Sequence, residues 1–171
     1  MANTDRKVGF QPKNIKDAET RKYKILAAET TQSGDVLEMD STGYVKAYAG
    51  GPIVGVQNGA ITSNASATKG ENIATAATGD TVSLWDDPFE LFVGQIAEFT
   101  LTDPYTTRAT AACYDNAGSA GAQYINNAVS TNDTWKIHRL NSEQNGTESA
   151  VGAYAKVECS FNPGKHLYGP G

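Results

Sequence analysis

Two adjacent carboxylates, Asp86 and Asp87, come nearest in this chain to an arrangement that could do chemistry. As a pair they could act as general acid and base, and together with Asp115 and Asn116 they could bind Ca²⁺. Adjacent residues of a strand point to opposite faces, however, so the two side chains do not cooperate easily. Because Pro88 follows them, the sequence favours a turn in which the Asp side chains accept backbone N–H groups.

The remaining reactive side chains are scattered. His138 and His166 have no His, Cys or carboxylate companions at the spacings of metal sites, so we expect His138 on the polar face of a strand and His166 in a solvated tail. Cys113 and Cys159 are far apart in sequence and are expected as buried free thiols. No G-x-S-x-G, Walker or G-x-G-x-x-G motif occurs. We therefore expect no catalytic residue, no metal site, no cofactor and no enzymatic activity.

The composition of the 171 residues favours a single all-β domain. Hydrophobic residues make up 39% and charged residues 19%, and Gly, Thr, Ala, Ser and Asn supply much of the rest. Those residues suit turns and polar sheet faces better than amphipathic helices. No stretch approaches the roughly 18 apolar residues of a membrane span, and the first residues lack the apolar core of a signal peptide. We expect no membrane partner.

Charge is unevenly distributed along the chain. Residues 1–24 hold seven basic and three acidic residues, a net charge of +4. Because the net charge of the whole chain is −5, the remaining residues carry a net charge of −9. A basic arm on an acidic body suggests docking on an acidic surface, such as that of a neighbouring copy, and a merely solvated tail is the alternative. The basic residues lack interleaved aromatics and the body would repel phosphates, so no nucleic acid is expected.

The densest run of large apolar residues lies at 82–96 and predicts the centre of the core. Two short segments of strand character flank a turn at 86–88, because proline cannot donate to a sheet ladder. Burial of each large side chain there would contribute about 1.5 to 3 kcal/mol. The side chains expected at this centre are Trp85, Phe89, Leu91 and Phe92.

Short strands separated by Gly and Asp turns fill the rest of the chain and predict an antiparallel sandwich or Greek-key barrel, jelly-roll-like. Residues 135–140 form one expected strand, and alternation over 153–161 predicts another with Cys159 and Phe161 facing the core. Residues 60–78 form a polar insert, and Asn145-Gly146 predicts a hairpin. We expect an extended N-terminal arm over 1–21, the β domain over 22–162 and a C-terminal tail over 163–171.

Several motifs resemble those of one group of virion proteins. The opening ANTDRKVGFQPK, the run SGDVLEMDSTGYVKA followed by PIVGV, the corner DDPFELF and a late strand ending in F-N occur in this order. The chain resembles the capsid cement, or head decoration, proteins of tailed bacteriophages. The similarity extends over most of the chain, and the arm and the DDPF corner are its most distinctive parts.

This resemblance implies a structural, non-enzymatic protein on the outer capsid surface of the virion, synthesised in the host cytoplasm, that binds the major capsid protein and reinforces the lattice. It also implies self-association as a homotrimer, with a dimer as the alternative. Two arms with isolated apolar anchors would suit docking across subunits with avidity. The capsid-binding residues expected on this basis are Arg6, Lys7, Phe10, Pro12, Lys13, Ile15, Leu167 and Tyr168.

Two other functions remain open from the sequence. Loops containing Tyr and Asn would suit a carbohydrate-binding or adhesin-like module on a virion. The chain could also be a major capsid protein, although it is short for that role and lacks the long helix of such a shell fold. On the decoration reading, removal of residues 1–20 should leave a folded domain that no longer binds heads.

Overall fold

The computed structural model describes residues 9–62, 73–96, 98–99, 110–114, 123–126, 134–141 and 150–169. Their strands pair in antiparallel sheets, which confirms the predicted all-β class. The elements are β1 (Gln11–Pro12), β2 (Arg21–Lys24), β3 (Thr30–Gln32), β4 (Val36–Met39), β5 (Val45–Ala47), β6 (Ile53–Thr62), β7 (Ile73–Thr75), β8 (Thr81–Trp85), β9 (Phe92–Gln95), β10 (Glu98–Phe99), β11 (Thr110–Tyr114), β12 (Tyr124–Asn126), β13 (Trp135–Leu140), β14 (Gly152–Ala153), β15 (Lys156–Phe161) and the short 3₁₀ turn η1 (Pro163–Lys165).

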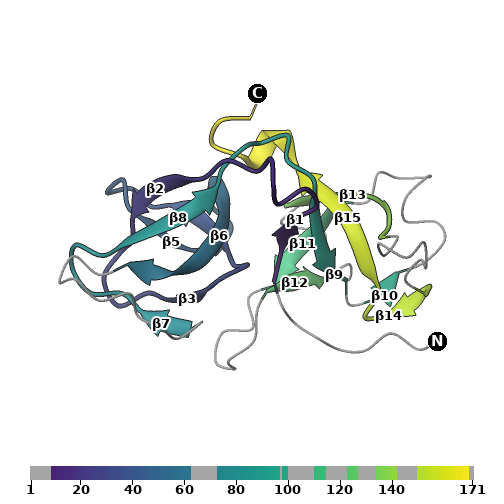
Figure 1. Ribbon diagram of the computed structural model, residues 1–171, viewed down its shortest axis with the longest axis horizontal. Coiled ribbons are helices and arrows are strands. Elements are labelled where there is room, and N and C mark those ends of the chain that lie inside the picture. The colour runs from purple at the N-terminus through teal and green to yellow at the C-terminus, as the bar shows by residue number, and fades with distance from the viewer. Residues whose placement is uncertain are drawn as a thin grey trace.

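The first half of the chain forms a small barrel, at the left of Figure 1. Its five strands are ordered β2-β8-β6-β4-β5, and a bridge between Ile25 and Val45 joins the two edges. The Leu26 N–H donates to the Val45 carbonyl at 2.9 Å beside this bridge. The barrel interior is a cluster of alternate, inward-facing side chains, as period-2 geometry requires. It comprises Ile25, Leu37, Val45, Val54, Ile61, Ala74, Ala76, Val82 and Leu84.

A six-stranded sheet in the order β1-β9-β15-β13-β11-β12 forms the other half. An isolated bridge between Ile96, just after β9, and Ile125 in β12 brings two distant strands of the sheet together. The sheet therefore curls around its own apolar face. The short pair β10–β14 lies at one end of it in Figure 1.

The barrel and the curled sheet share one core, built around Trp135. The Phe10 ring stacks on the Trp135 ring at 4.1 Å between centroids, and the Phe161 ring stacks on Trp135 at 4.7 Å. Phe92 meets the same indole edge-on at 5.6 Å. Alternate residues on the outer face of the barrel, including Val36, complete this cluster from the other side.

Two buried polar contacts hold the halves in register. The Gln123 side chain pairs with the backbone of Val36 in both directions: the Val36 N–H donates to Oε1 at 2.8 Å, and Nε2 donates to the Val36 carbonyl at 3.2 Å. The Thr134 hydroxyl donates to the Tyr48 hydroxyl at 3.0 Å. Because polar groups are costly to bury unpaired, these contacts favour one orientation of barrel and sheet.

The segment that begins at residue 9 belongs to the core, which corrects the expected extended arm over 1–21 for its described part. β1 pairs with β9, Phe10 is fully buried and Pro12 is buried. A Cβ on Gly94 would lie 2.3 Å from the Phe10 ring, so only glycine leaves room for this ring. An apolar residue in a polar arm can pack on its own domain or on a partner, and Phe10 packs on its own domain.

The stretch 82–96 does form strand, turn and strand, but its predicted role as the centre of the core is wrong for two residues. Phe89 is 70% exposed and Leu91 is 37% exposed, whereas Trp85 and Phe92 are buried. The reason is topological: β8 belongs to the barrel and β9 to the curled sheet, so residues 86–91 cross the outside of the molecule.

The last strands follow the predicted pattern, and the tail does not. β13 has the predicted bounds, and Cys159 and Phe161 are buried as predicted, although β15 begins only at Lys156. The predicted free tail over 163–171 is instead attached as far as it is described, because His166 bridges to Ile53. The Asn145-Gly146 hairpin, Asp115, Asn116 and residues 63–72 of the polar insert lie outside the described residues; the ends of the insert belong to β6 and β7.

Replacing Phe10 with Ala should lower the free energy of unfolding by about 3 to 5 kcal/mol, the usual cost of truncating a buried Phe. The physical reason is the loss of the stack on Trp135 and the cavity left between barrel and sheet. Chemical denaturation followed by tryptophan fluorescence measures the change. Replacement of the exposed Ile15 by Ala is the control and should change stability little. An unchanged stability of the Phe10 variant would contradict this account of the core.

Candidate interaction surface

Three segments far apart in sequence meet where the barrel joins the curled sheet, at the top of Figure 1: residues 13–17, 86–91 and 166–168. The Lys13 N–H donates to the Leu91 carbonyl at 2.7 Å, which joins the first two segments. The Leu167 N–H donates to the Ile53 carbonyl at 2.7 Å and attaches the third segment to the barrel, where His166 lies close enough to Asp86 and Asp87 for their charges to act on its pKa. The segments carry most of the large exposed apolar side chains of the described residues, which we call the apolar ridge. The ridge comprises Ile15, Phe89, Leu91, Leu167 and Tyr168.

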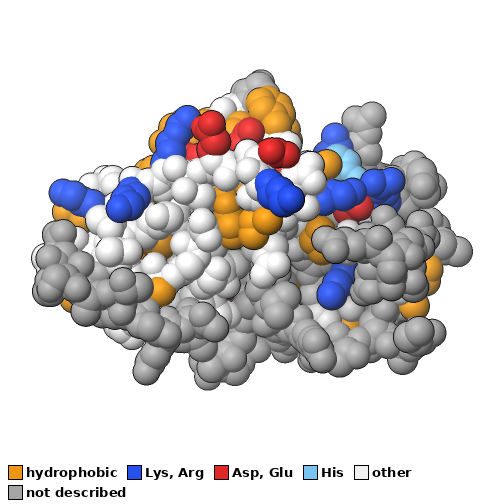
Figure 2. Space-filling model, viewed as in Figure 1, with side chains coloured by type: hydrophobic (Ala, Val, Ile, Leu, Met, Phe, Trp, Pro, Cys, Tyr) orange, Lys and Arg blue, Asp and Glu red, His pale blue; other side chains and the backbone are white. Residues whose placement is uncertain are grey.

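Figure 2 shows hydrophobic side chains at this upper side of the molecule, with acidic and basic side chains around them. Ile15 is 63% exposed and Tyr168 is 50% exposed. Scattered exposed apolar residues are ordinary, but several on adjoining segments mark a surface suited to protein contact.

Asp86 attaches residues 86–91, which we call the crossing segment, to the barrel. Its carboxylate is buried and accepts a hydrogen bond from the Tyr23 hydroxyl at 2.6 Å, and the Arg21 guanidinium lies 3.5 Å away. Burial raises the pKa of Tyr23, and the hydrogen bond to Asp86 and the neighbouring Tyr168 raise it further. Tyr23 therefore stays a neutral donor, and the Asp86 contacts join segments that are distant in sequence.

Asp87 shapes the turn that presents Phe89. Its Oδ1 accepts the Phe89 N–H at 2.8 Å, as predicted for an Asp beside Pro88. Asp86 differs from the prediction, because its partners are side chains of β2 and not the backbone of the turn. The two carboxylates thus have separate structural tasks.

His166 holds the third segment in place, which corrects the expectation of a solvated tail residue. It is 5% exposed, its Nδ1 accepts the Tyr168 N–H at 3.2 Å, and its ring centroid lies 5.0 Å from that of Phe161. Burial lowers the pKa of His166, and the charges of Asp86 and Asp87 offset this only in part. The buried imidazole is consequently neutral at pH 7.

Lys13 binds within the chain. Its ammonium lies 2.6 Å from the Glu158 carboxylate, and Arg139 Nε donates to the other Glu158 oxygen at 2.8 Å. Burial acts to raise the pKa of Glu158, but the hydrogen bonds from Lys13 and Arg139 outweigh it and hold that pKa below its ordinary value. This paired charge ties the segment after β1 to β13 and β15.

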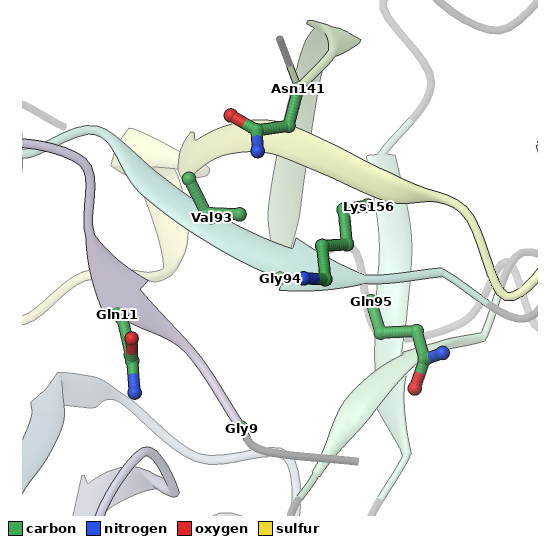
Figure 3. A pocket seen from close by; sticks show the side chains of 7 residues that line it. All are labelled: Gly9, Gln11, Val93, Gly94, Gln95, Asn141 and Lys156. Atoms are coloured by element: carbon green, nitrogen blue, oxygen red, sulfur yellow. The ribbon is translucent and has the colours of Figure 1, made fainter. Parts of the chain in front are cut away.

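A small pocket of about 100 Å³ lies beside β1, β9 and β15. Figure 3 shows Lys156 extending past Gly94, with Asn141 above and Gln11 and Gln95 at its margins. Sites for organic ligands usually enclose about 300 to 1,000 Å³ and are mostly apolar, so this pocket does not suit a substrate.

Within the described part of the chain, no three His, Cys, Asp or Glu side chains gather as metal ligands would. His138 is exposed and its Nε2 lies 2.9 Å from the Ser160 hydroxyl, in the polar position that its strand predicts. Cys159 is a buried free thiol, as predicted. No described helix is long and apolar enough to cross a membrane.

The structure separates the residues that the resemblance assigned to capsid binding. Ile15, Leu167 and Tyr168 lie on the ridge, whereas Phe10 and Pro12 are buried and are not available for contact. Lys13 is engaged by Glu158. Arg6 and Lys7 lie outside the described residues.

Phe89 and Leu91 are the ridge residues that the sequence reading assigned to the core instead. A signal was present: they directly follow Asp86-Asp87-Pro88, and residues of these types favour a turn over a buried strand.

Comparison of the chain with protein-family models, with curated proteins and with solved structures finds no match.

Stability should fall as the pH drops from about 6.5 to 5.5, because an unfolded His has a pKa near 6.5 and binds a proton that buried His166 resists. The slope from one such group cannot exceed about 1.4 kcal/mol per pH unit. Replacing His166 with Gln should reduce this slope, as measured by denaturant titrations across the range. Partial burial of the ring and the charge of Lys136 also lower the pKa of His138, so His138→Gln is the matched control and should remove only the part of the pH slope that His138 contributes. A wild-type slope in the His166 variant would contradict the role given to its burial.

Proposed function

We propose that this protein is a structural virion component that binds the outer surface of a tailed-phage head and reinforces the capsid lattice, using the apolar ridge as its contact surface. The observation that carries the proposal is the ridge itself, an exposed apolar surface assembled from three segments that internal contacts fix in place. The resemblance of the opening segment and the DDPF corner to head decoration proteins supplies the identity of the partner, the major capsid protein.

The construction of the ridge supports a binding role. The groups beneath it, Asp86 with Tyr23 and His166 with the Tyr168 backbone, fix its segments before any partner arrives. A preformed surface loses little conformational entropy on binding, so more of the gain from apolar burial appears as affinity. A cement protein needs such a surface because it must hold an already assembled lattice.

Self-association is part of the proposal, with a homotrimer preferred and a dimer as the alternative. Several ridges on one oligomer would contact neighbouring capsid subunits together, and linked weak contacts multiply into avidity. The shared core between barrel and curled sheet makes each copy a stiff unit that can transmit load between those contacts.

Replacing Phe89 with Ser should weaken binding to purified heads that lack this protein by roughly 10- to 100-fold, because burial of a Phe contributes about 1.5 to 3 kcal/mol. Co-sedimentation with the heads gives the affinity, and electron microscopy of decorated particles gives the location. Val151→Ser is the matched control, since Val151 is 48% exposed and lies outside the ridge. Equal binding by the Phe89 variant and the wild type would exclude the ridge as the contact.

Deleting residues 1–8 tests the two predicted basic contacts that precede the described segment. Phe10 and its stack on Trp135 remain in the shortened chain, so the thermal unfolding temperature should stay close to that of the full chain. Loss of Arg6 and Lys7 should weaken head binding at low salt and reduce its dependence on ionic strength. Deletion of residues 1–20, by contrast, removes Phe10 and should destabilise the fold. Unchanged head binding after the shorter deletion would remove Arg6 and Lys7 from the interface.

A further inference from the structure

Three carboxylates border the apolar ridge. Asp87 and Glu90 lie on either side of Phe89 in the crossing segment, and Asp17 follows Ile15 in the first segment. In the described structure none of the three carboxylates forms an ion pair, whereas the nearby cations Lys13 and Arg21 face Glu158 and Asp86. The negative charge at the border is therefore available to a partner.

The carboxylates also act on one another. Burial raises the pKa of Glu90, and the charges of Asp87 and Asp17 raise it further, so these side chains share a negative field. The negative charge is concentrated in residues 86–91, which hold three carboxylates and no basic residue, and in the described structure only Asp86 among them is paired, with Arg21. Lys16 and Lys165 lie in or beside the other two segments.

We infer that the ridge fits a protein surface in which an apolar centre is flanked by Lys and Arg side chains. This inference rests on the proposed function and specifies the partner: the capsid surface that receives the ridge presents cations opposite Asp17, Asp87 and Glu90. Apolar contact then supplies most of the affinity, and charge complementarity supplies orientation and rejection of other surfaces.

A second copy of this chain is a poorer occupant of the ridge. A twofold contact brings the same patch of both copies together, so the acidic borders would face one another. Like charges held close across an interface oppose association. The homo-oligomer of the proposed function must accordingly form through another surface, which leaves the ridge free for the capsid.

The test compares Asp87→Asn and Glu90→Gln with the wild type in binding to purified heads that lack this protein, at low and at moderate NaCl concentration. Asn retains the oxygen that accepts the Phe89 N–H, so the turn is preserved. Each neutral variant should bind about 3- to 10-fold more weakly at low salt, and the double variant should lose the part of the salt dependence that these two carboxylates contribute. The charge reversal Glu90→Lys should weaken binding more than Glu90→Gln does, by about 10- to 100-fold, because repulsion replaces attraction.

Glu29→Gln is the matched control. Arg21 begins β2, and Glu29 follows the other end of this strand. The Oε2 atom of Glu29 accepts the Ala47 N–H, a bond that Gln can keep. This variant removes one negative charge from the barrel and should leave both affinity and salt dependence unchanged. An equal loss in Glu29→Gln would point to net charge alone and would overturn the inference.

The remaining outcomes separate the inference from the function on which it rests. If Phe89→Ser weakens binding while the Asp87 and Glu90 variants behave as wild type, the cationic partner is overturned and head binding stands. If the wild-type protein does not bind heads, both fail. If sedimentation shows wild-type self-association that Phe89→Ser abolishes, the ridge is a self-contact and the inference is overturned.

Discussion

The structure depends on the stack of Phe10 on Trp135. Trp135 lies in the middle of the curled sheet, and the Phe10 ring fills the space between this indole and the barrel, above a glycine that leaves room for it. Without this ring a cavity would separate the Trp135 indole from the barrel, and the core shared by the two halves would lose its central contact. The segment that carries Phe10 also begins the first strand of the curled sheet before the chain crosses to the barrel, so the same residues join the halves covalently and by packing.

The ridge is a consequence of this joint. The chain passes from the curled sheet to the barrel after β1 and returns after β8. Both connections lie on the outside, because core side chains fill the space between the two halves. Backbone contacts place the crossings side by side, and Asp86 and His166 bind them from beneath. An exposed apolar surface thus rests on some of the most firmly held residues of the molecule.

Local pattern was sufficient to predict the fold class, the strand β13 and the core face of β15, since period-2 alternation depends only on neighbouring residues. It was insufficient for Phe10 and Phe89: Phe10 was expected at a contact surface and is buried, whereas Phe89 was expected in the core and is exposed. Both are large and apolar in polar surroundings, and what decides their burial is which sheet the following strand joins, a fact not contained in the local sequence.

Glu158 illustrates the same limit. Alternation placed it on the polar face of its strand, yet it is buried, because Lys13 reaches it from a segment 145 residues away. Among the predicted contact residues, Ile15, Leu167 and Tyr168 are exposed and lie in turns. Phe10 is buried and Lys13 is paired because each has a partner far away in the sequence. The aspartates and proline before Phe89 could have identified residues 86–91 as a turn. The spacing of residues along the sequence could not predict that this turn lies beside residues 13–17 and 166–168.

The placement of Phe10 also has a consequence for how the protein is made. Its ring partner Trp135 lies in β13 and itself stacks on Phe161 in β15, and the final part of the ridge follows only at Tyr168. Contacts between such distant residues form late and slow folding, because the intervening loop must be closed first. Phe10 therefore cannot take its place until β13, which carries Trp135, is present. A chain without its last strands therefore lacks both the stack that places Phe10 and the third segment of the ridge.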